Sequence, residues 1–135
     1  MARSLAQLRA ADALKRIRAM ESESYGKYVS YVSALPATIL NSGLGQAMAQ
    51  LLAQARGSED AHKVLHDQVQ SWLCEERKLF DKLTDGRAAH QSNLILGIVE
   101  GDQKTYLTAQ AEALAYLEWL KKFARAFLKR PDLRP

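Results

Sequence analysis

The chain has 135 residues, of which 47% are hydrophobic and 25% are charged, with seven glycines and three prolines. This balance excludes a disordered chain and fits one globular domain, so we assign residues 1–135 to a single domain. Lysine and arginine exceed aspartate and glutamate by 19 to 15. Good helix formers dominate and no strand-like alternation is present, which predicts an all-α fold, a compact bundle of about six helices.

Targeting and redox features indicate a cytoplasmic protein. No stretch approaches the ~20 consecutive apolar residues that cross a membrane, and the first residues lack the apolar run of a secretory signal. A single cysteine, Cys74, excludes an intrachain disulfide, and its place in a helical pattern predicts a buried, inert thiol.

The first predicted helix begins after a Ser4 N-cap and runs to about Met20. Three basic residues, Lys15, Arg16 and Arg18, lie near its end, where the helix dipole favours positive charge.

A second helix is expected to begin near Ser22 or Ser24 and to close at Pro36, because the residue before a proline resists the α conformation.

The stretch from Leu35 to Gln54 is the most informative part of the sequence. Asn41–Gly43 predicts a break, and a new helix is expected to begin near Gly43. Gly43 and Gly45 permit a sharp turn or a close approach by another group. The helix then combines an apolar stripe with an uncharged face, on which the side chains are Gln46, Gln50 and Gln54.

The remaining helices are predicted from their end signals. Gly57–Ser58 ends one helix and caps the next, which carries its apolar residues along one stripe as far as Phe80. Asp85–Gly86 predicts a turn. A short helix is expected over residues 90–100, and the last helix begins after an Asp102 N-cap and ends at Pro131.

Catalytic and metal motifs are weak. Glu59 and His62 have the Glu-x-x-His spacing of di-iron bundles, but those sites need a second such pair. His62 and His66 stand at i and i+4 without a recognisable third ligand, and His66–Asp67 lacks the other ligands of a metal phosphohydrolase. We assign no catalytic residue, no metal site and no cofactor.

The charges favour nucleic acid more strongly. Residues 1–34 and 102–135 each carry a net charge of +3, and residues 35–101 carry −2. If both ends pack side by side, the molecule has one positive face; otherwise these are ordinary solvated termini. Sequence-independent contacts to an RNA backbone are expected from cations spaced along helices: Lys15, Arg16, Arg18, Lys121, Lys122, Arg125 and Lys129. Core packing explains Trp119 and Phe123 better than base stacking does.

Three segments carry a resemblance to a known family. The first joins Leu35–Pro36, Ile39–Asn41 and Gly43–Ala47 to Leu51. The second is Trp72–Cys74 and the third is Glu118–Ala124. In this order they resemble the small subunits of the type III-B CRISPR RNA-targeting effector, the Cmr complex, over nearly the whole chain.

The resemblance implies a non-catalytic subunit that stacks with further copies of itself and with other Cmr subunits, and that helps to hold guide RNA and target RNA. It makes the basic residues candidates for phosphate contacts. It also makes Gly43, Gly45, Gln46 and Gln50 candidates for close approach or subunit contact. The alternative is a helical adaptor that binds proteins and has no nucleic-acid role.

Overall fold

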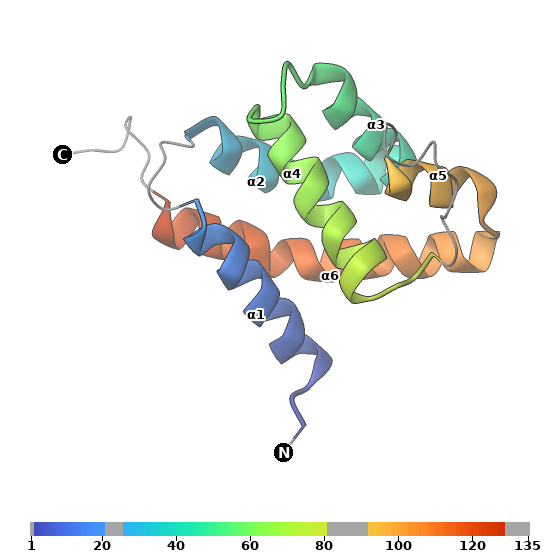
Figure 1. Cartoon of the computed structure of the whole chain (residues 1–135), viewed down its shortest axis with the longest axis horizontal. Coiled ribbons are helices and arrows are strands. Elements are labelled where there is room, and N and C mark those ends of the chain that lie inside the picture. Colours follow the sequence, from blue (N-terminus) through green and yellow to red (C-terminus); the bar gives the residue numbers. More distant parts are fainter. Residues whose placement is uncertain (1, 21–25, 81–91, 129–135) are drawn as a thin grey trace.

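The computed structural model describes residues 2–20, 26–80 and 92–128. These ranges hold six α-helices, one π-helical segment and no strand, which confirms the predicted all-α fold (Figure 1). The elements are α1 (Leu5–Arg18), α2 (Gly26–Ser42), α3 (Leu44–Gln54), α4 (Ala61–Gln70), η1 (Ser71–Glu76), α5 (Asn93–Glu100) and α6 (Gln103–Phe127).

The long helix α6 organises the bundle. α1 and α2 both pack on it, α3 packs on α2 and α4, and α5 packs on α3. In Figure 1, α1 runs obliquely from the N-terminus to the end of α6 that is nearer the C-terminus. The first and last helices therefore lie side by side, which is the arrangement that a shared positive face would require.

The core is one continuous cluster to which every helix contributes. Its largest fully buried side chains include Tyr28, Tyr116, Ile17, Ile39 and Leu44. Burial of this apolar surface is the main force that holds the helices together. The apolar stripe predicted toward Phe80 is buried at Leu65, Val69 and Trp72.

Polar side chains cap four of the described helices. Ser4 forms a capping box with Gln7 at the start of α1, as a serine N-cap predicts. Asp102 accepts the Thr105 N–H at the start of α6, which confirms the predicted cap. Asp60 caps α4 and Ser92 caps α5. The prediction that Ser58 caps α4 was wrong, because Asp60 accepts the backbone N–H of His62.

The predicted end of a helix at Pro36 was also wrong. Pro36 lies inside α2, which continues to Ser42. A proline there cannot donate to the carbonyl of Val32, yet Val32, Leu35 and Ile39 are all buried on the same face of α2. Their packing outweighs the missing hydrogen bond, so the helix continues through the proline. The predicted break at Gly43 is confirmed, since α3 begins directly after it.

Two boundaries of the later helices differ from the prediction. The stripe toward Phe80 is divided, because α4 passes into the π-helical η1, which ends at Glu76. α6 ends at Phe127, before the predicted stop at Pro131. Pro131, the predicted turn at Asp85–Gly86 and the predicted caps Ser22 and Ser24 lie outside the described residues.

Candidate nucleic-acid interface

The three basic candidates on α1 lie in different environments. Lys15 and Arg18 are exposed, and within the described part of the chain neither forms an ion pair. Arg16 is half-buried, and its guanidinium donates to the Ser71 hydroxyl at 2.6 Å and lies 3.6 Å from Asp12. The structure thus leaves two of these cations available to a ligand and engages the third within the fold.

A buried polar cluster, which we call the central clamp, joins α1 and η1 to α6. Arg9 donates two hydrogen bonds to Glu112, at 2.6 and 2.9 Å. The Trp72 indole donates to the same carboxylate at 2.9 Å. Asp12 accepts a hydrogen bond from Tyr116 at 2.6 Å, and the Trp72 and Tyr116 rings stack. Sequence reasoning missed this cluster, because its members come from three distant segments and share no local motif.

The electrostatics of the clamp follow from its partners. Burial raises the pKa of Glu112, but hydrogen bonds from Arg9 and Trp72 and the nearby charges lower it more, so the carboxyl pKa falls below its usual value.

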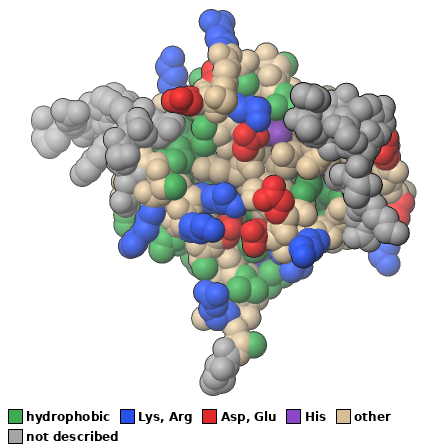
Figure 2. All heavy atoms as spheres, viewed as in Figure 1, with side chains coloured by type: hydrophobic (Ala, Val, Ile, Leu, Met, Phe, Trp, Pro, Cys, Tyr) green, Lys and Arg blue, Asp and Glu red, His purple; other side chains and the backbone are tan. Residues whose placement is uncertain are grey.

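Figure 2 shows basic side chains (blue) and acidic side chains (red) interspersed across the middle of the face that it draws, where α1, α4 and α6 cross. Much of the positive charge here is therefore neutralised by adjacent acids.

The basic candidates on α6 are more accessible. The Lys122 side chain is 69% exposed and lies 3.7 Å from Glu118. Lys121 is half-buried and pairs with the same glutamate at 3.3 Å. Arg125 is exposed and has no ion-pair partner among the residues that the structure describes. Lys129 lies outside the described residues.

Aromatic residues follow the same half of α6. Trp119, Phe123 and Phe127 form a row with ring centroids 5.7 and 6.0 Å apart. Core packing was the preferred interpretation of Trp119 and Phe123, and for Trp119 it was wrong. Trp119 is 36% exposed and Phe127 is 47% exposed, whereas Phe123 is half-buried against the core. We call these three residues the aromatic row.

The two candidate glycines are approached closely by groups of the same chain. Gly43 has φ +89°, a conformation that favours glycine, and a Cβ there would lie 2.7 Å from the Tyr106 hydroxyl. The Leu44 N–H donates to the Gln110 side chain, and the Gly45 N–H donates to Tyr106. The structural reason for Gly43 is thus the packing of the α2–α3 turn against α6, whereas a Cβ at Gly45 would lie 3.2 Å from Ile98 of α5.

The two glutamine candidates remain on the surface. Gln46 and Gln50 are both exposed on α3. Gln50 also lines a groove of about 930 Å³ between α2, α3 and the start of α4, together with Lys27 and Arg56. Both glutamines are accessible to a neighbouring molecule.

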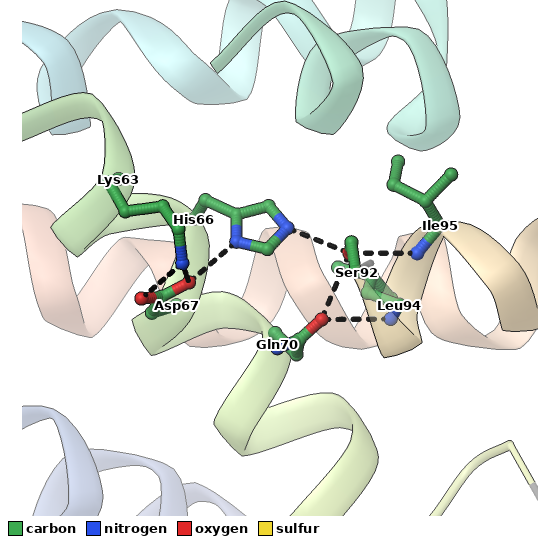
Figure 3. Close-up of polar contacts among 7 residues, drawn as sticks. All are labelled: Lys63, His66, Asp67, Gln70, Ser92, Leu94 and Ile95. Atoms are coloured by element: carbon green, nitrogen blue, oxygen red, sulfur yellow. Dashed lines mark hydrogen bonds and ion pairs between the residues drawn. The ribbon is translucent and has the colours of Figure 1, made fainter. Parts of the chain in front are cut away.

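A buried histidine lies in a network that joins α4 to α5 (Figure 3). His66 contacts Asp67 through Nδ1 and the Ser92 hydroxyl through Nε2, each at 2.8 Å. This order of acid, imidazole and hydroxyl is that of a catalytic triad. However, the Ser92 oxygen accepts the Ile95 N–H and donates to Gln70, and His66 is 1% exposed. The arrangement therefore serves to cap α5.

The other sequence motifs also have local partners. His62 stacks on Tyr31 and contacts the Asp60 carboxylate. Across residues 2–20, 26–80 and 92–128, no three acidic, histidine or cysteine side chains are placed to hold a metal ion. Cys74 is half-buried, and burial raises the pKa of its thiol to about 12. No helix in the described ranges is long and apolar enough to cross a membrane.

The fold and this surface define a small all-helical protein whose longest helix presents both exposed cations and exposed aromatic rings in its C-terminal half. The sequence matches the CRISPR-associated protein family Cas_Cmr5 over residues 5–127. The chain therefore belongs to the Cmr5 family. It is 30% identical to the CRISPR system Cmr subunit Cmr5 of Thermus thermophilus over 128 residues, which cover 94% of this chain and 98% of that protein.

A solved structure supports the same assignment. The crystal structure of a CRISPR-associated Cmr5 family protein, also from Thermus thermophilus, matches with a TM-score of 0.72 and 28% sequence identity. The match covers 95% of this chain and all of that one. The helical arrangement described above is thus the fold of this family.

Proposed function

We propose that this chain is a non-catalytic small subunit of a type III-B CRISPR (Cmr) ribonucleoprotein. It would stack with other copies and other Cmr subunits, and help to hold guide RNA and target RNA through contacts to the RNA backbone. Membership of the Cmr5 family supports the subunit role. The observation that best supports RNA contact is that two cations on α6, Lys122 and Arg125, are exposed. Arg125 has no acidic partner in the described ranges.

The chemistry of these cations favours backbone contact without base readout. Lysine and arginine bind phosphate through charge, and each contact releases counterions, so binding weakens as salt rises. Lys122 and Arg125 stand at i and i+3 and are therefore neighbours on the helix surface. Lys15 and Arg18 are the matching exposed candidates on α1.

Protein contacts are assigned to uncharged surface. Gln46 and Gln50 are exposed on α3, and their amides can donate and accept hydrogen bonds without bringing net charge to an interface. Replacing both with glutamate is expected to reduce co-purification of the other subunits. The affinity of the isolated chain for RNA should change far less than after reversal of the α6 cations.

Charge reversal tests the RNA role. The triple change Lys122→Glu, Arg125→Glu and Lys129→Glu is expected to weaken RNA loading of the assembled complex, most clearly at low salt, with helicity intact. A matched control reverses three basic residues placed elsewhere: Lys27, Arg56 and Lys104 are all exposed. Both triple variants alter the net charge equally, so a specific face predicts that only the first loses RNA.

Two outcomes would contradict the proposal. Equal RNA loading by the wild type and by the variant with Lys122, Arg125 and Lys129 reversed, at several salt concentrations, would remove the role of these cations. A tagged chain that recovers protein partners but no RNA would favour a helical adaptor without a nucleic-acid role.

A further inference from the structure

Large apolar side chains on a helix are usually buried, but two of the three in the aromatic row are exposed. Trp119, Phe123 and Phe127 stand at i, i+4 and i+8 on α6, and therefore follow one line along the helix surface. The rings of neighbours are tilted by 36° and 33°, so each pair makes a packed contact. Trp119 and Phe127 nevertheless remain 36% and 47% exposed. The row is ordered by its own contacts and still offers ring surface to solvent.

One of the basic residues already assigned to phosphate, Lys122, lies beside the start of the row. Lys122 follows Trp119 by three positions, and Arg125 follows Lys122 by three. Lys122 is therefore a neighbour of Trp119 on the helix surface, whereas Arg125, two positions after Phe123 and two before Phe127, lies on a different face of α6 from those two rings. The acid nearest the row in the sequence is Glu118, directly before Trp119, and it contacts Lys121 and Lys122. An anionic ligand that also carries flat apolar groups matches this combination.

We propose that the aromatic row is a stacking platform for unpaired bases of single-stranded RNA, with Trp119 as its main contact. This inference rests on the proposed RNA role and adds to it. Lys122, which is a neighbour of Trp119, holds the backbone, and one or two bases turn toward α6 and stack on exposed ring faces. Aromatic side chains beside a basic groove are the usual means of binding single strands without reading their sequence. A plain phosphate track would need no exposed rings.

The fluorescence of Trp119 can be used to measure this stacking. The chain has two tryptophans, and Trp72 is buried at 3% exposure with its N–H bonded to Glu112. Stacked bases should therefore quench mainly Trp119 emission. The probes are a short single-stranded oligoadenylate, an abasic oligonucleotide of the same length, and inorganic polyphosphate, each titrated into the full-length chain.

The expected results separate stacking from charge. Oligoadenylate should quench the emission and bind more tightly than the abasic strand, by roughly five- to ten-fold for a partly exposed ring. Trp119→Ala should remove this difference and leave polyphosphate binding unchanged. Trp119→Phe should keep much of it, whereas Trp119→Leu, which is apolar but has no ring, should not. Leu107→Ala is the matched control, since Leu107 is 54% exposed elsewhere on α6.

The contrary results are also distinct. Equal affinity for oligoadenylate and the abasic strand, both sensitive to salt, would overturn stacking and leave the backbone role standing. No binding of any of the three probes would overturn both. If Trp119→Ala leaves RNA affinity unchanged but prevents assembly with the other subunits, the row is a protein interface and the proposal is wrong.

Discussion

Arg9 and Arg125 belong to two regions of the molecule that the sequence presents alike, as cations on helices near the chain ends. In the central clamp, Arg9 is 20% exposed and donates to the buried Glu112 through Nε and Nη2. On α6, Arg125 is exposed and has no acidic partner in the described part of the chain. The first arginine stabilises the fold, and the second is available to a ligand.

The difference teaches that burial and partners, more than residue type, decide the role of a charge. A buried ion pair stabilises little relative to an apolar pair, but the loss of one partner leaves an uncompensated charge in a poorly solvated site. An exposed cation has little effect on stability, because water and salt screen it. Substitutions in the clamp should therefore act on folding, and substitutions on α6 should act on binding.

Glu112→Gln should have the largest effect. The amide cannot balance the charge of Arg9 or accept its two hydrogen bonds and that of Trp72 together, so we expect a loss of about 3–5 kcal/mol in the free energy of unfolding. Urea denaturation followed by circular dichroism measures it. The control is Glu118→Gln on the same helix, which should change stability by less than about 0.5 kcal/mol. Similar midpoints for both variants would break the distinction between the two regions.

Gly43→Ala should have the next-largest effect on the free energy of unfolding. The residue has φ +89° and ψ 158°, and the new methyl group would lie 2.7 Å from the Tyr106 hydroxyl. Backbone strain and the clash should together cost about 2–3 kcal/mol. Adding Tyr106→Phe removes the hydroxyl and should recover part of the loss relative to Tyr106→Phe alone, as a double-mutant cycle by thermal unfolding would show. Additive losses would mean that the two residues do not meet.

His66 should make a smaller contribution to the change of folding stability with pH. Burial lowers the pKa of His66 below its usual value of about 6.5, although Asp67 opposes the shift. The unfolded chain therefore takes up a proton before the folded chain does, and stability falls as the pH drops below about 6.5. The urea midpoint should decrease between about pH 7.5 and pH 5.5, and His66→Gln should show a weaker decrease. An equal slope in both proteins would exclude His66 as its source.

The features of the fold that could be predicted from the sequence are those governed by local chemistry. The Ser4 and Asp102 caps and the break at Gly43 follow from side chains and conformations within a few residues. Pro36 misled the prediction because its effect on α2 depends on burial against other helices. The pairing of Arg9 with Glu112 spans 103 positions, and no spacing rule indicates it. The exposure of Trp119 has the same origin, since it depends on which faces of α6 the neighbouring helices leave uncovered.

The smallest effect on stability should give the sharpest comparison between the two regions. Arg125→Gln should leave the free energy of unfolding within about 0.5 kcal/mol of wild type. Because each lost phosphate contact to single-stranded RNA removes about 0.7 from the slope of log affinity against log salt, that slope should become shallower by about this amount.

Arg16→Gln should affect the stability of the fold and not the binding of RNA. It removes a hydrogen bond to Ser71 and the ion pair with Asp12, so it should lower stability by about 1–3 kcal/mol and leave the salt slope unchanged. If Arg16→Gln instead lowers the slope and Arg125→Gln does not, the half-buried arginine reaches RNA and the roles of the two regions are exchanged. Only the two measurements together, on both variants, separate a cation that stabilises the fold from one that binds RNA.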